Sequence, residues 1–275
     1  MENQLVKKYF REDRLPHIWC PGCSHGIVMK SIAKAIDKLG LDKDKVCIVS
    51  GIGCSSRAPG YMDFNTLHTT HGRAIAFATG VKLANPELKV IVITGDGDSA
   101  AIGGNHLIHG CRRNIDITTI VFNNNIYGMT GGQYSPTTPT KDMGTTAPYG
   151  NIDKPFDICD LAGAAGATYT ARSTSYHVNQ LEKYIMKGID HKGFSLVEAV
   201  SICPTYYGRK NRKGSAVDMM KFLKDSFIDI KAYDRLDEEK CKDKFLMGEF
   251  KDISAPEYTE EYQKIINSLG GNENE

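Results

Sequence analysis

Two short polar runs at the ends of apolar segments contain the residue types that bind a metal ion and a phosphate. Asp96 lies in a Gly-Asp-Gly turn after the apolar run 90–93, and asparagines 123–125 follow the run that ends at Phe122. Ligands of open α/β sheets bind at the carboxyl ends of the strands, so neighbouring strands would bring Asp96 close to an asparagine. A carboxylate and an amide oxygen suit Mg²⁺, with a diphosphate completing the octahedral shell. The pairing therefore predicts a site for Mg²⁺ and a diphosphate.

Glycines near the predicted metal site would let the backbone approach phosphate oxygens closely. They are Gly95, Gly97, Gly103 and Gly104. A helix that begins near Ala101 would direct its N-terminal amides and the positive end of its dipole toward the same oxygens. The stretch resembles the thiamine diphosphate motif, in which GDG is followed by NN after a helix and a strand. The resemblance implies Mg²⁺ ligands from the side chains of Asp96 and Asn124 and from the backbone carbonyl of Ile126.

One Cys-x-x-Cys pair, Cys20 and Cys23, stands directly before a predicted helix. A thioredoxin-like pair needs a strand before the motif, and residues 1–18 look irregular. A zinc site needs two further ligands, usually from a second close pair, which the sequence lacks. A [4Fe–4S] cluster needs four thiolates that can be dispersed, and Cys54 and Cys203 both follow apolar strands. The pattern alone leaves all three kinds of site open. We interpret the remaining cysteines as structural: Cys47, Cys111, Cys159 and Cys241.

Short β-branched runs alternate with amphipathic segments, which predicts an α/β fold with a doubly wound, mainly parallel sheet. The predicted strands are residues 46–50, 89–94, 115–122 and 194–200. The predicted helices are residues 24–39, 73–84, 101–112, 157–165 and 175–189. Ser24 is expected to cap the first of these helices and Gly40 to end it.

Length and charge narrow the class of protein. The chain has 275 residues, 41% of them hydrophobic and 24% charged, as is ordinary for a globular protein. Its net charge of +1 provides no overall field that would attract nucleic acid or a membrane surface. No apolar run approaches the ~18 residues of a membrane span, and the N-terminus lacks an apolar secretory signal. Because eight cysteines without a disulfide framework are typical of a reducing compartment, we expect a cytoplasmic protein.

Two regions interrupt the alternation of strands and helices. Residues 127–156 form a long loop rich in Gly and Pro, which is usually functional or disordered. The tail after Tyr207 is about twice as dense in charged residues as the rest of the chain, so it could not form a core alone. We expect a cofactor domain over residues 1–207 and a charged C-terminal arm over residues 208–275 that docks on a partner subunit.

Six motifs, in order over residues 15–213, resemble the thiamine-binding β subunit of the 2-oxoacid:ferredoxin oxidoreductases. They are WCPGCSHG, GIGCSSR, HTTHGRAIAFATG, GDGDSAAIGGNH, NNNIYGMTGGQYSPTT and CPTYYGRKN. The resemblance implies the thiamine-diphosphate-binding fold and a [4Fe–4S] cluster held by Cys20, Cys23, Cys54 and Cys203. It also implies a cofactor-binding set of Cys54, His71, Gly95, Asp96, Gly97, Asp98, Asn124, Ile126, Gly128 and Met129.

The activity implied by the resemblance is the oxidative decarboxylation of a 2-oxo acid, with coenzyme A as acyl acceptor and ferredoxin as electron acceptor. This chemistry needs an electron sink and a one-electron acceptor, so thiamine diphosphate and a cluster on one chain form a coherent pair. A glutamate must also activate the thiamine pyrimidine, and no Glu here has a recognisable context for that role. We expect an α subunit to supply it, alongside any further small subunits, and we expect this chain to be inactive alone.

Two other classes of protein compete with this interpretation. A non-redox thiamine enzyme, such as a decarboxylase, would place its pyrimidine and diphosphate domains in one chain that is well beyond this length. A non-catalytic iron–sulfur or zinc interaction module would need no thiamine site. Bound cofactor separates the three classes, since only the oxidoreductase contains both thiamine diphosphate and iron.

Two side chains are candidates for contact with the substrate. The resemblance favours His71, in an H-x-x-H motif with His68, as a group near the diphosphate or the reacting carbonyl, with helix capping as the alternative. It also puts a basic side chain facing the substrate at Arg57. A guanidinium would pair with the second carboxylate of 2-oxoglutarate, which is costly to bury unpaired. We therefore expect 2-oxoglutarate as substrate and succinyl-coenzyme A as product, ahead of pyruvate or a branched-chain 2-oxo acid.

Two further segments belong to this interpretation. Residues 127–133 are expected to form the lip of the substrate pocket, with Met129 lining it. Residues 206–211, directly after Cys203, also look more like the 2-oxoglutarate enzymes than the pyruvate enzymes, although the residue types alone offer no mechanism for that preference.

Overall fold

Parallel pairing of the β-branched runs forms the sheet that positions the site. The structure is a computed structural model and describes residues 2–233, 235, 241 and 244–270. In these residues eight strands form one sheet in the order β2-β1-β3-β4-β8-β7-β10-β9. The strands are β1 (Val46–Ser50), β2 (Asn65–His68), β3 (Lys89–Gly95), β4 (Thr118–Asn123), β7 (Tyr169–Thr174), β8 (Ser195–Val200), β9 (Phe227–Asp229) and β10 (Phe245–Asp252). The pairs are parallel except β10 with β7, which is antiparallel.

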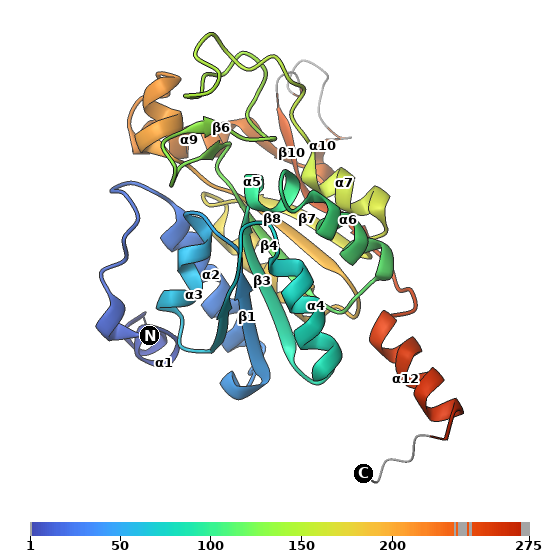
Figure 1. Cartoon of the computed structure of the whole chain (residues 1–275). Helices are drawn as coiled ribbons and strands as arrows, with labels where there is room; N and C mark the ends of the chain where they lie inside the picture. The colour runs from blue at the N-terminus through green and yellow to red at the C-terminus, as the bar shows by residue number, and fades with distance from the viewer. Residues whose placement is uncertain (1, 234, 236–240, 242–243, 271–275) are drawn as a thin grey trace.

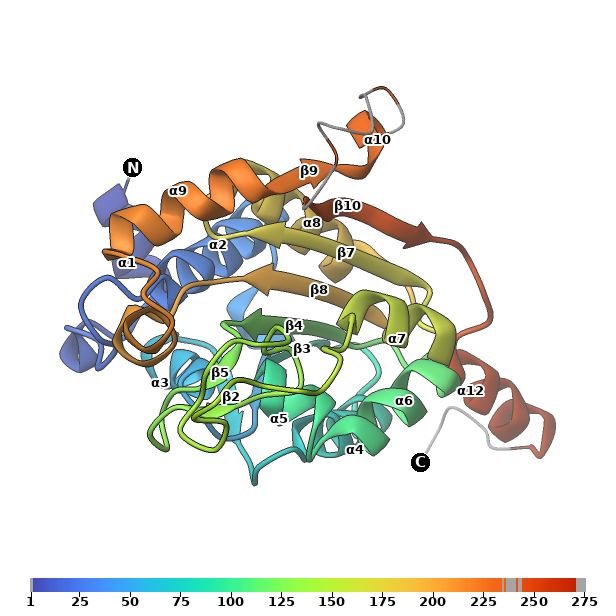
Figure 2. The ribbon, with the colours of Figure 1, turned by 90° about the horizontal axis from the view of Figure 1, so that it is seen from above.

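Helices cover both faces of the sheet, so β1, β4 and β8 are buried along their whole length and β3 is buried except at its two end residues. Figure 2 shows the two helical layers from above. The longer helices are α1 (Glu2–Tyr9), α2 (His25–Lys38), α4 (Ala74–Ala84), α6 (Gly104–Arg113), α7 (Ile158–Ala165), α8 (Val178–Asp190), α9 (Ala216–Ser226) and α12 (Tyr258–Ser268). Shorter helical turns are α3 (Ala58–Tyr61), α5 (Asp96–Ala100) and α10 (Ile230–Tyr233).

Alternate residues of each strand supply two separate cores. Ile91 and Ile93 of β3 pack with α2 and α8 on one face. Val90 and Val92 of the same strand pack with α4, α6 and α7 on the other. This arrangement of three layers fixes the strand ends that hold the polar residues (Figure 1). Among the described residues, no helix has the length and apolar character needed to cross a membrane.

The predicted mainly parallel, doubly wound fold is confirmed, and most predicted elements lie where we expected them. The four predicted strands are β1, β3, β4 and β8, with β4 beginning at Thr118 rather than residue 115. The helix predicted over residues 101–112 is α6, which begins at Gly104 rather than near Ala101. The sequence pattern missed the short helix α5, which begins at Asp96 and ends at Ala100. Ser24 precedes α2 but does not cap it, since its hydroxyl oxygen accepts a hydrogen bond from the backbone of Ile202 at 2.9 Å.

The sequence pattern gave no prediction for β2, β7, β9 or β10. Residue 208, where we expected the charged arm to begin, is the last residue of a π-helical turn (Pro204–Gly208), and the chain beyond it returns to the sheet. Met219 and Leu223 of α9 and Met247 of β10 are buried, so this segment packs on the domain. The arm also includes residues 234, 236–240, 242–243 and 271–275, which lie outside the described residues. A role of the arm in subunit docking stays a prediction.

Candidate active site

The carboxyl ends of β1, β3 and β4 surround one cavity, where open α/β sheets bind their ligands. The chain leaves β1 toward β2 on one side and later returns to β3 on the other, so the cavity lies at a reversal of strand order. All ten residues of the cofactor-binding set expected from the sequence line it. They are Cys54, His71, Gly95, Asp96, Gly97, Asp98, Asn124, Ile126, Gly128 and Met129.

Asp96 is a buried carboxylate without a cationic partner among the described residues. The hydroxyls of Ser135 and Thr137 each lie 2.6 Å from its Oδ2 atom. Burial raises the pKa of Asp96 to about 6, against the lowering effect of these hydrogen bonds. A buried negative charge that only hydroxyls and backbone amides solvate favours a bound cation, because desolvation otherwise penalises the charged form.

The structure separates the roles of the three consecutive asparagines. The Asn123 amide donates to Glu198 Oε1 at 2.7 Å, and its oxygen accepts from the backbone N–H of Asn125 at 3.1 Å. Asn124 is buried, lines the cavity and makes no side-chain hydrogen bond within the described part of the chain. Asn125 lines a different hollow. Asn124 is therefore the asparagine whose amide oxygen is available to a ligand in the cavity.

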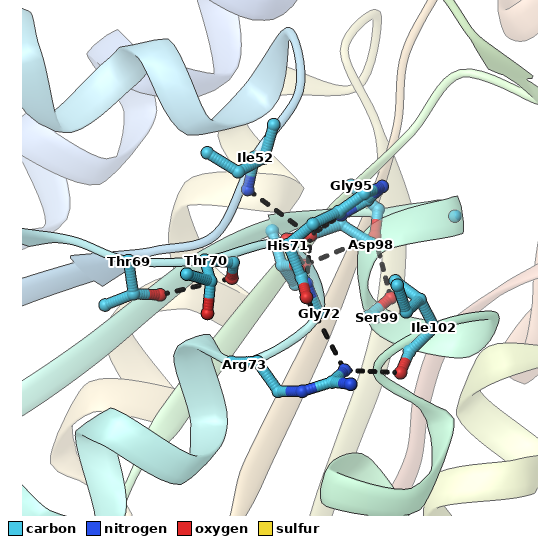
Figure 3. A network of polar contacts seen from close by, with 12 residues as sticks. Ile52, Thr69, Thr70, His71, Gly72, Arg73, Gly95, Asp98, Ser99 and Ile102 are labelled. Carbon is cyan, nitrogen blue, oxygen red and sulfur yellow. Dashed lines mark hydrogen bonds and ion pairs between the residues drawn. The ribbon is translucent and has the colours of Figure 1, made fainter.

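A polar network around Asp98 joins two loops of the cavity wall (Figure 3). Its carboxylate accepts hydrogen bonds from the backbone of Gly72 at 2.7 Å and of Ile52 at 3.3 Å, and from Thr94 Oγ1 at 2.7 Å. It also pairs with Nδ1 of His71. Asp98 is thus occupied by protein groups, and it fixes the orientation of a half-buried imidazole that borders the cavity.

The four cysteines of the expected cluster converge beside this cavity. The position of a Cβ on Gly128 would lie 3.4 Å from Cys54 Sγ and 3.7 Å from Cys203 Sγ. The pKa of Cys23 is raised to about 12 by burial and by the charges of Cys203, Cys54 and Cys20, and a hydrogen bond from the His25 backbone N–H opposes the rise. Among the described residues, no three of these thiols lie within 4.8 Å of one another, the spacing that a single ion requires. The set is therefore more open than a tetrahedral zinc site.

Backbone N–H groups donate hydrogen bonds to two of the four sulfur atoms, those of Cys23 and Cys203. Such donors stabilise the thiolate form that binds a metal. The N–H groups of Tyr206 and Tyr207 in the π-helical turn lower the pKa of Cys203, although burial raises it overall. Burial also raises the pKa of Cys54 to about 11. Because these thiols are protonated at neutral pH, a metal that binds them must displace their protons.

Two further residues bear on the site: Arg57, which we expected there from the sequence, and His25, which we did not. Arg57 is exposed, does not line the cavity, and makes no side-chain hydrogen bond or ion pair in the described part of the chain. His25 is 1% exposed and lines the cavity, and neither ring nitrogen has a partner among the described residues. Burial lowers the pKa of His25 to about 4, so the ring is neutral.

The loop 127–156 contributes Tyr127, from the segment expected to form the lip of the pocket, and also Ser135 and Thr137, to which the sequence pattern assigned no role. Tyr127 lines the cavity, its hydroxyl donates to the Gly97 carbonyl at 3.2 Å, and a Cβ at Gly97 would meet its ring. Ser135 and Thr137 contact Asp96. Their run, SPTT, was part of a resembling motif, but hydroxyl residues in a Pro-rich loop are common and gave no separate signal.

Comparison with known proteins assigns the class of this domain. Residues 51–199 match the family model described as thiamine pyrophosphate enzyme, C-terminal TPP binding domain. The chain is 56% identical to the 2-oxoglutarate synthase subunit KorB of Methanothermobacter marburgensis, over 98% of this chain and 94% of the relative. It is 58% identical to the subunit of the same name from Methanocaldococcus jannaschii, over 95% and 97% of the two chains.

A solved structure agrees with these relatives. The 2-oxoglutarate:ferredoxin oxidoreductase from Magnetococcus marinus, with 2-oxoglutarate, coenzyme A and succinyl-CoA bound, superposes with a TM-score of 0.87 at 36% identity, covering 100% of this chain and 94% of that one. The site and fold are those of a thiamine diphosphate-binding domain. The chain belongs to the β subunits of the 2-oxoacid:ferredoxin oxidoreductases.

Proposed function

We propose that this chain is the catalytic β subunit of a coenzyme A-dependent 2-oxoglutarate:ferredoxin oxidoreductase that forms succinyl-coenzyme A and CO₂. The single observation that supports this function best is the shared position of Cys54 and Gly128. Both line the cavity of Asp96 and Asn124, and both border the cysteine cluster. A thiamine cofactor in this cavity would therefore lie next to the group that removes its electrons.

The residues present fit magnesium and thiamine diphosphate. The Asp96 carboxylate and the Asn124 amide oxygen would bind Mg²⁺, with the Ile126 carbonyl as a third protein ligand, since these are hard oxygen donors. Gly95 and Gly97 would let the backbone approach the diphosphate. Bound thiamine diphosphate would supply the electron sink for loss of CO₂. We assign His71, held by Asp98, to the polar contact with the diphosphate or the reacting carbonyl.

The cysteine set fits a [4Fe–4S] cluster better than zinc. Cys54 and Cys203 both lie close to Gly128, and Cys23 lies near enough to Cys20, Cys54 and Cys203 for their charges to affect its pKa. In the described part of the chain, no three of the four thiols are as close together as one ion requires, and backbone amides face two of them. Amide hydrogen bonds to sulfur are one way in which proteins tune the potential of such clusters. Cys20, Cys23, Cys54 and Cys203 would be the ligands. The cluster would receive electrons one at a time and pass them to ferredoxin.

The chain needs a partner to complete this activity. Among the described residues, none of those that line the cavity is a glutamate, which supports an α subunit as the source of the activating carboxylate. Coenzyme A and the 2-oxo acid would bind where the two subunits meet, and further small subunits are compatible with this arrangement. A reducing cytoplasm suits a chain whose cysteines are all free.

The preference for 2-oxoglutarate is supported by the substrate named for the similar proteins, and we assign Arg57 to the second carboxylate of that substrate. Since Arg57 is exposed on this chain, it would contact substrate only where the α subunit closes the pocket over it. Changing Arg57 to Met should lower kcat/KM for 2-oxoglutarate by roughly 5- to 150-fold, about 1–3 kcal/mol of lost binding, and should spare 2-oxobutyrate. Equal losses on both substrates would assign Arg57 to another role.

Reduction of methyl viologen and of ferredoxin by the anaerobically reconstituted complex tests the proposed function. The complex receives coenzyme A and one of a panel of 2-oxo acids that includes pyruvate and 2-oxoisovalerate. We expect the highest kcat/KM with 2-oxoglutarate and no turnover by this chain alone. Thiamine diphosphate without iron would favour a non-redox thiamine enzyme, and zinc without thiamine diphosphate would favour an interaction module.

A further inference from the structure

The segment after Cys203 concentrates positive charge in a chain that is otherwise nearly neutral. Arg209, Lys210, Arg212 and Lys213 are the only charged residues between Ser201 and Val217. The whole chain has a net charge of +1, so the remainder has +1 − 4 = −3. We call residues 209–213 the cationic segment. Such a segment is ordinarily a solvated part of the surface. Here most of its charges lack ion-pair partners among the described residues and it lies beside the cysteine cluster, which favours a surface that binds another protein.

Most charges of the cationic segment have no carboxylate partner. Arg209, Lys210 and Arg212 make no side-chain hydrogen bond or ion pair with any described residue. Lys213 lies 3.5 Å from Asp142 and is the exception. Three of the four charges of the segment are therefore not neutralised by the described part of the chain.

The backbone holds the cationic segment in a defined turn. The Asn211 side chain accepts from the Met143 N–H at 2.6 Å and donates to the Met143 carbonyl at 3.0 Å. The Lys213 N–H donates to the Gly208 carbonyl at 2.9 Å. A fixed turn presents its cations with little ordering cost on binding, which favours recognition of a partner.

The cationic segment lies next to the cysteine cluster. The turn that contains Cys20 and Cys23 packs against the residues that flank the segment in sequence, since a Cβ at Gly22 would lie 2.6 Å from Ala216 Cβ and 3.5 Å from Pro204 Cγ. The Gly208 N–H donates to the carbonyl of Cys203 at 2.9 Å. Figure 2 shows the turn after β8 beside the N-terminal segment. Cys20 is exposed, so this edge is where the cluster would approach solvent.

We propose that the cationic segment, through Arg209, Lys210 and Arg212, docks an acidic iron–sulfur electron carrier against the exposed edge of the cluster. This inference rests on the proposed function. Oxidation of the 2-oxo acid anion with coenzyme A thiol yields acyl-coenzyme A, CO₂, one proton and two electrons. Each docked one-electron carrier removes one electron from the reduced cluster, so two carriers are reduced for each substrate molecule.

Charge complementarity favours a protein partner over the phosphates of coenzyme A. Arg209 and Lys210 line neither the cofactor cavity nor the hollow beneath α9. Arg209 is exposed and Lys210 is half-buried outside both hollows, where a folded acidic partner can reach them. Complementary charge at the rim of an interface accelerates encounter and makes the rate depend on ionic strength, without contributing to the chemical step.

The test compares two charge-reversed complexes with the wild type. The first contains Arg209→Glu and Lys210→Glu. The matched control contains Lys183→Glu and Lys224→Glu, which reverse two exposed lysines on α8 and at the end of α9. Both variants change the net charge by the same amount. We measure KM for an acidic ferredoxin, its binding to the complex by calorimetry, and 2-oxoglutarate-dependent reduction of methyl viologen.

For the first variant we expect KM for ferredoxin to rise roughly tenfold at low ionic strength, with weaker calorimetric binding and a smaller salt dependence. Methyl viologen reduction should stay unchanged, and the control should match the wild type. Unchanged ferredoxin binding in an intact complex would overturn the inference. A higher KM for coenzyme A alone would assign the segment to the coenzyme, and failure to assemble would assign it to the α subunit. Loss of methyl viologen reduction in the wild type itself would instead contradict the proposed function.

Discussion

Asp96→Asn should stabilise the cofactor-free chain, because the wild-type residue is a buried carboxylate that has no cationic partner in the described chain until a metal ion binds. The pKa of Asp96 is raised from 3.8 to about 6 by burial. A shift of about 2 units corresponds to about 3 kcal/mol, at 1.36 kcal/mol per unit. Asn has nearly the same shape, and the Ser135 and Thr137 hydroxyls can rotate to accept hydrogen bonds from its amide.

The pH dependence has a definite sign. Between about pH 4 and pH 6 the folded chain binds more protons at Asp96 than the unfolded chain does, so the free energy of unfolding falls as pH rises through this window. The full penalty applies above pH 6 and is absent below pH 4. Asp96→Asn should therefore exceed the wild type in stability by up to about 3 kcal/mol at pH 7.5, and by little near pH 4.

Urea unfolding of the full chain, anaerobic and free of metal and thiamine diphosphate, measures this difference across the pH range. Asp98→Asn is the matched control with the opposite sign. It places an amide among donors from Gly72, Ile52, Thr94 and His71, so it should cost roughly 2–4 kcal/mol. Added Mg²⁺ and thiamine diphosphate should stabilise the wild type but not Asp96→Asn. Destabilisation of the cofactor-free chain by Asp96→Asn, or a gain that does not change with pH, would refute the reasoning.

Two further predictions concern the cluster and the core. Gly128→Ala places a methyl group between Cys54 and Cys203, so iron per chain should fall in the reconstituted protein, while Gly104→Ala, which meets nothing within 4 Å, should keep it. Equal iron in both variants would contradict the assigned position of the cluster. Lys82→Met leaves the buried Asp116 carboxylate without its main partner and should cost about 3–5 kcal/mol of unfolding free energy. Lys45→Met, at the exposed pair with Glu87, should leave the urea midpoint nearly unchanged. Similar urea midpoints for these two variants would contradict that distinction.

The sequence predicted the central sheet and the cavity because both depend on local signals. Continuous β-branched runs such as 90–93 are typical of strands buried on both faces, and polar residues directly after such runs must meet at one edge of a parallel sheet. For this reason the residue types and their spacing suffice to place Asp96 and Asn124 together. The choice of Asn124 over its neighbours was uncertain by one position. The hydrogen bonds of Asn123 and the separate hollow lined by Asn125 favour Asn124, whose role as a ligand stays a prediction.

The missed features depend on contacts between distant segments. β7 was missed because Thr170, Arg172 and Thr174 interrupt the apolar pattern expected of a buried strand, although all three residues are buried. Arg172 is neutralised by Glu198, 26 residues later, which no local pattern reports. β10 joins the sheet by antiparallel pairing with β7, although it lies within the segment that we expected to be a charged arm. The role expected for Asp98 in cofactor binding also stays a prediction, since the structure shows its oxygens engaged by protein donors.

The central claim is that one chain holds thiamine diphosphate and an iron–sulfur cluster side by side. The most direct measurement is the content of iron, sulfide and thiamine diphosphate in the anaerobically reconstituted complex, for the wild type, Cys203→Ser and Cys47→Ser. Cys47 is buried in the core of β1, so it serves as a control cysteine outside the site. We predict about four irons and one thiamine diphosphate per chain in the wild type and Cys47→Ser, and loss of iron with retention of thiamine diphosphate in Cys203→Ser. Full iron in Cys203→Ser, or its loss in Cys47→Ser, would contradict the account.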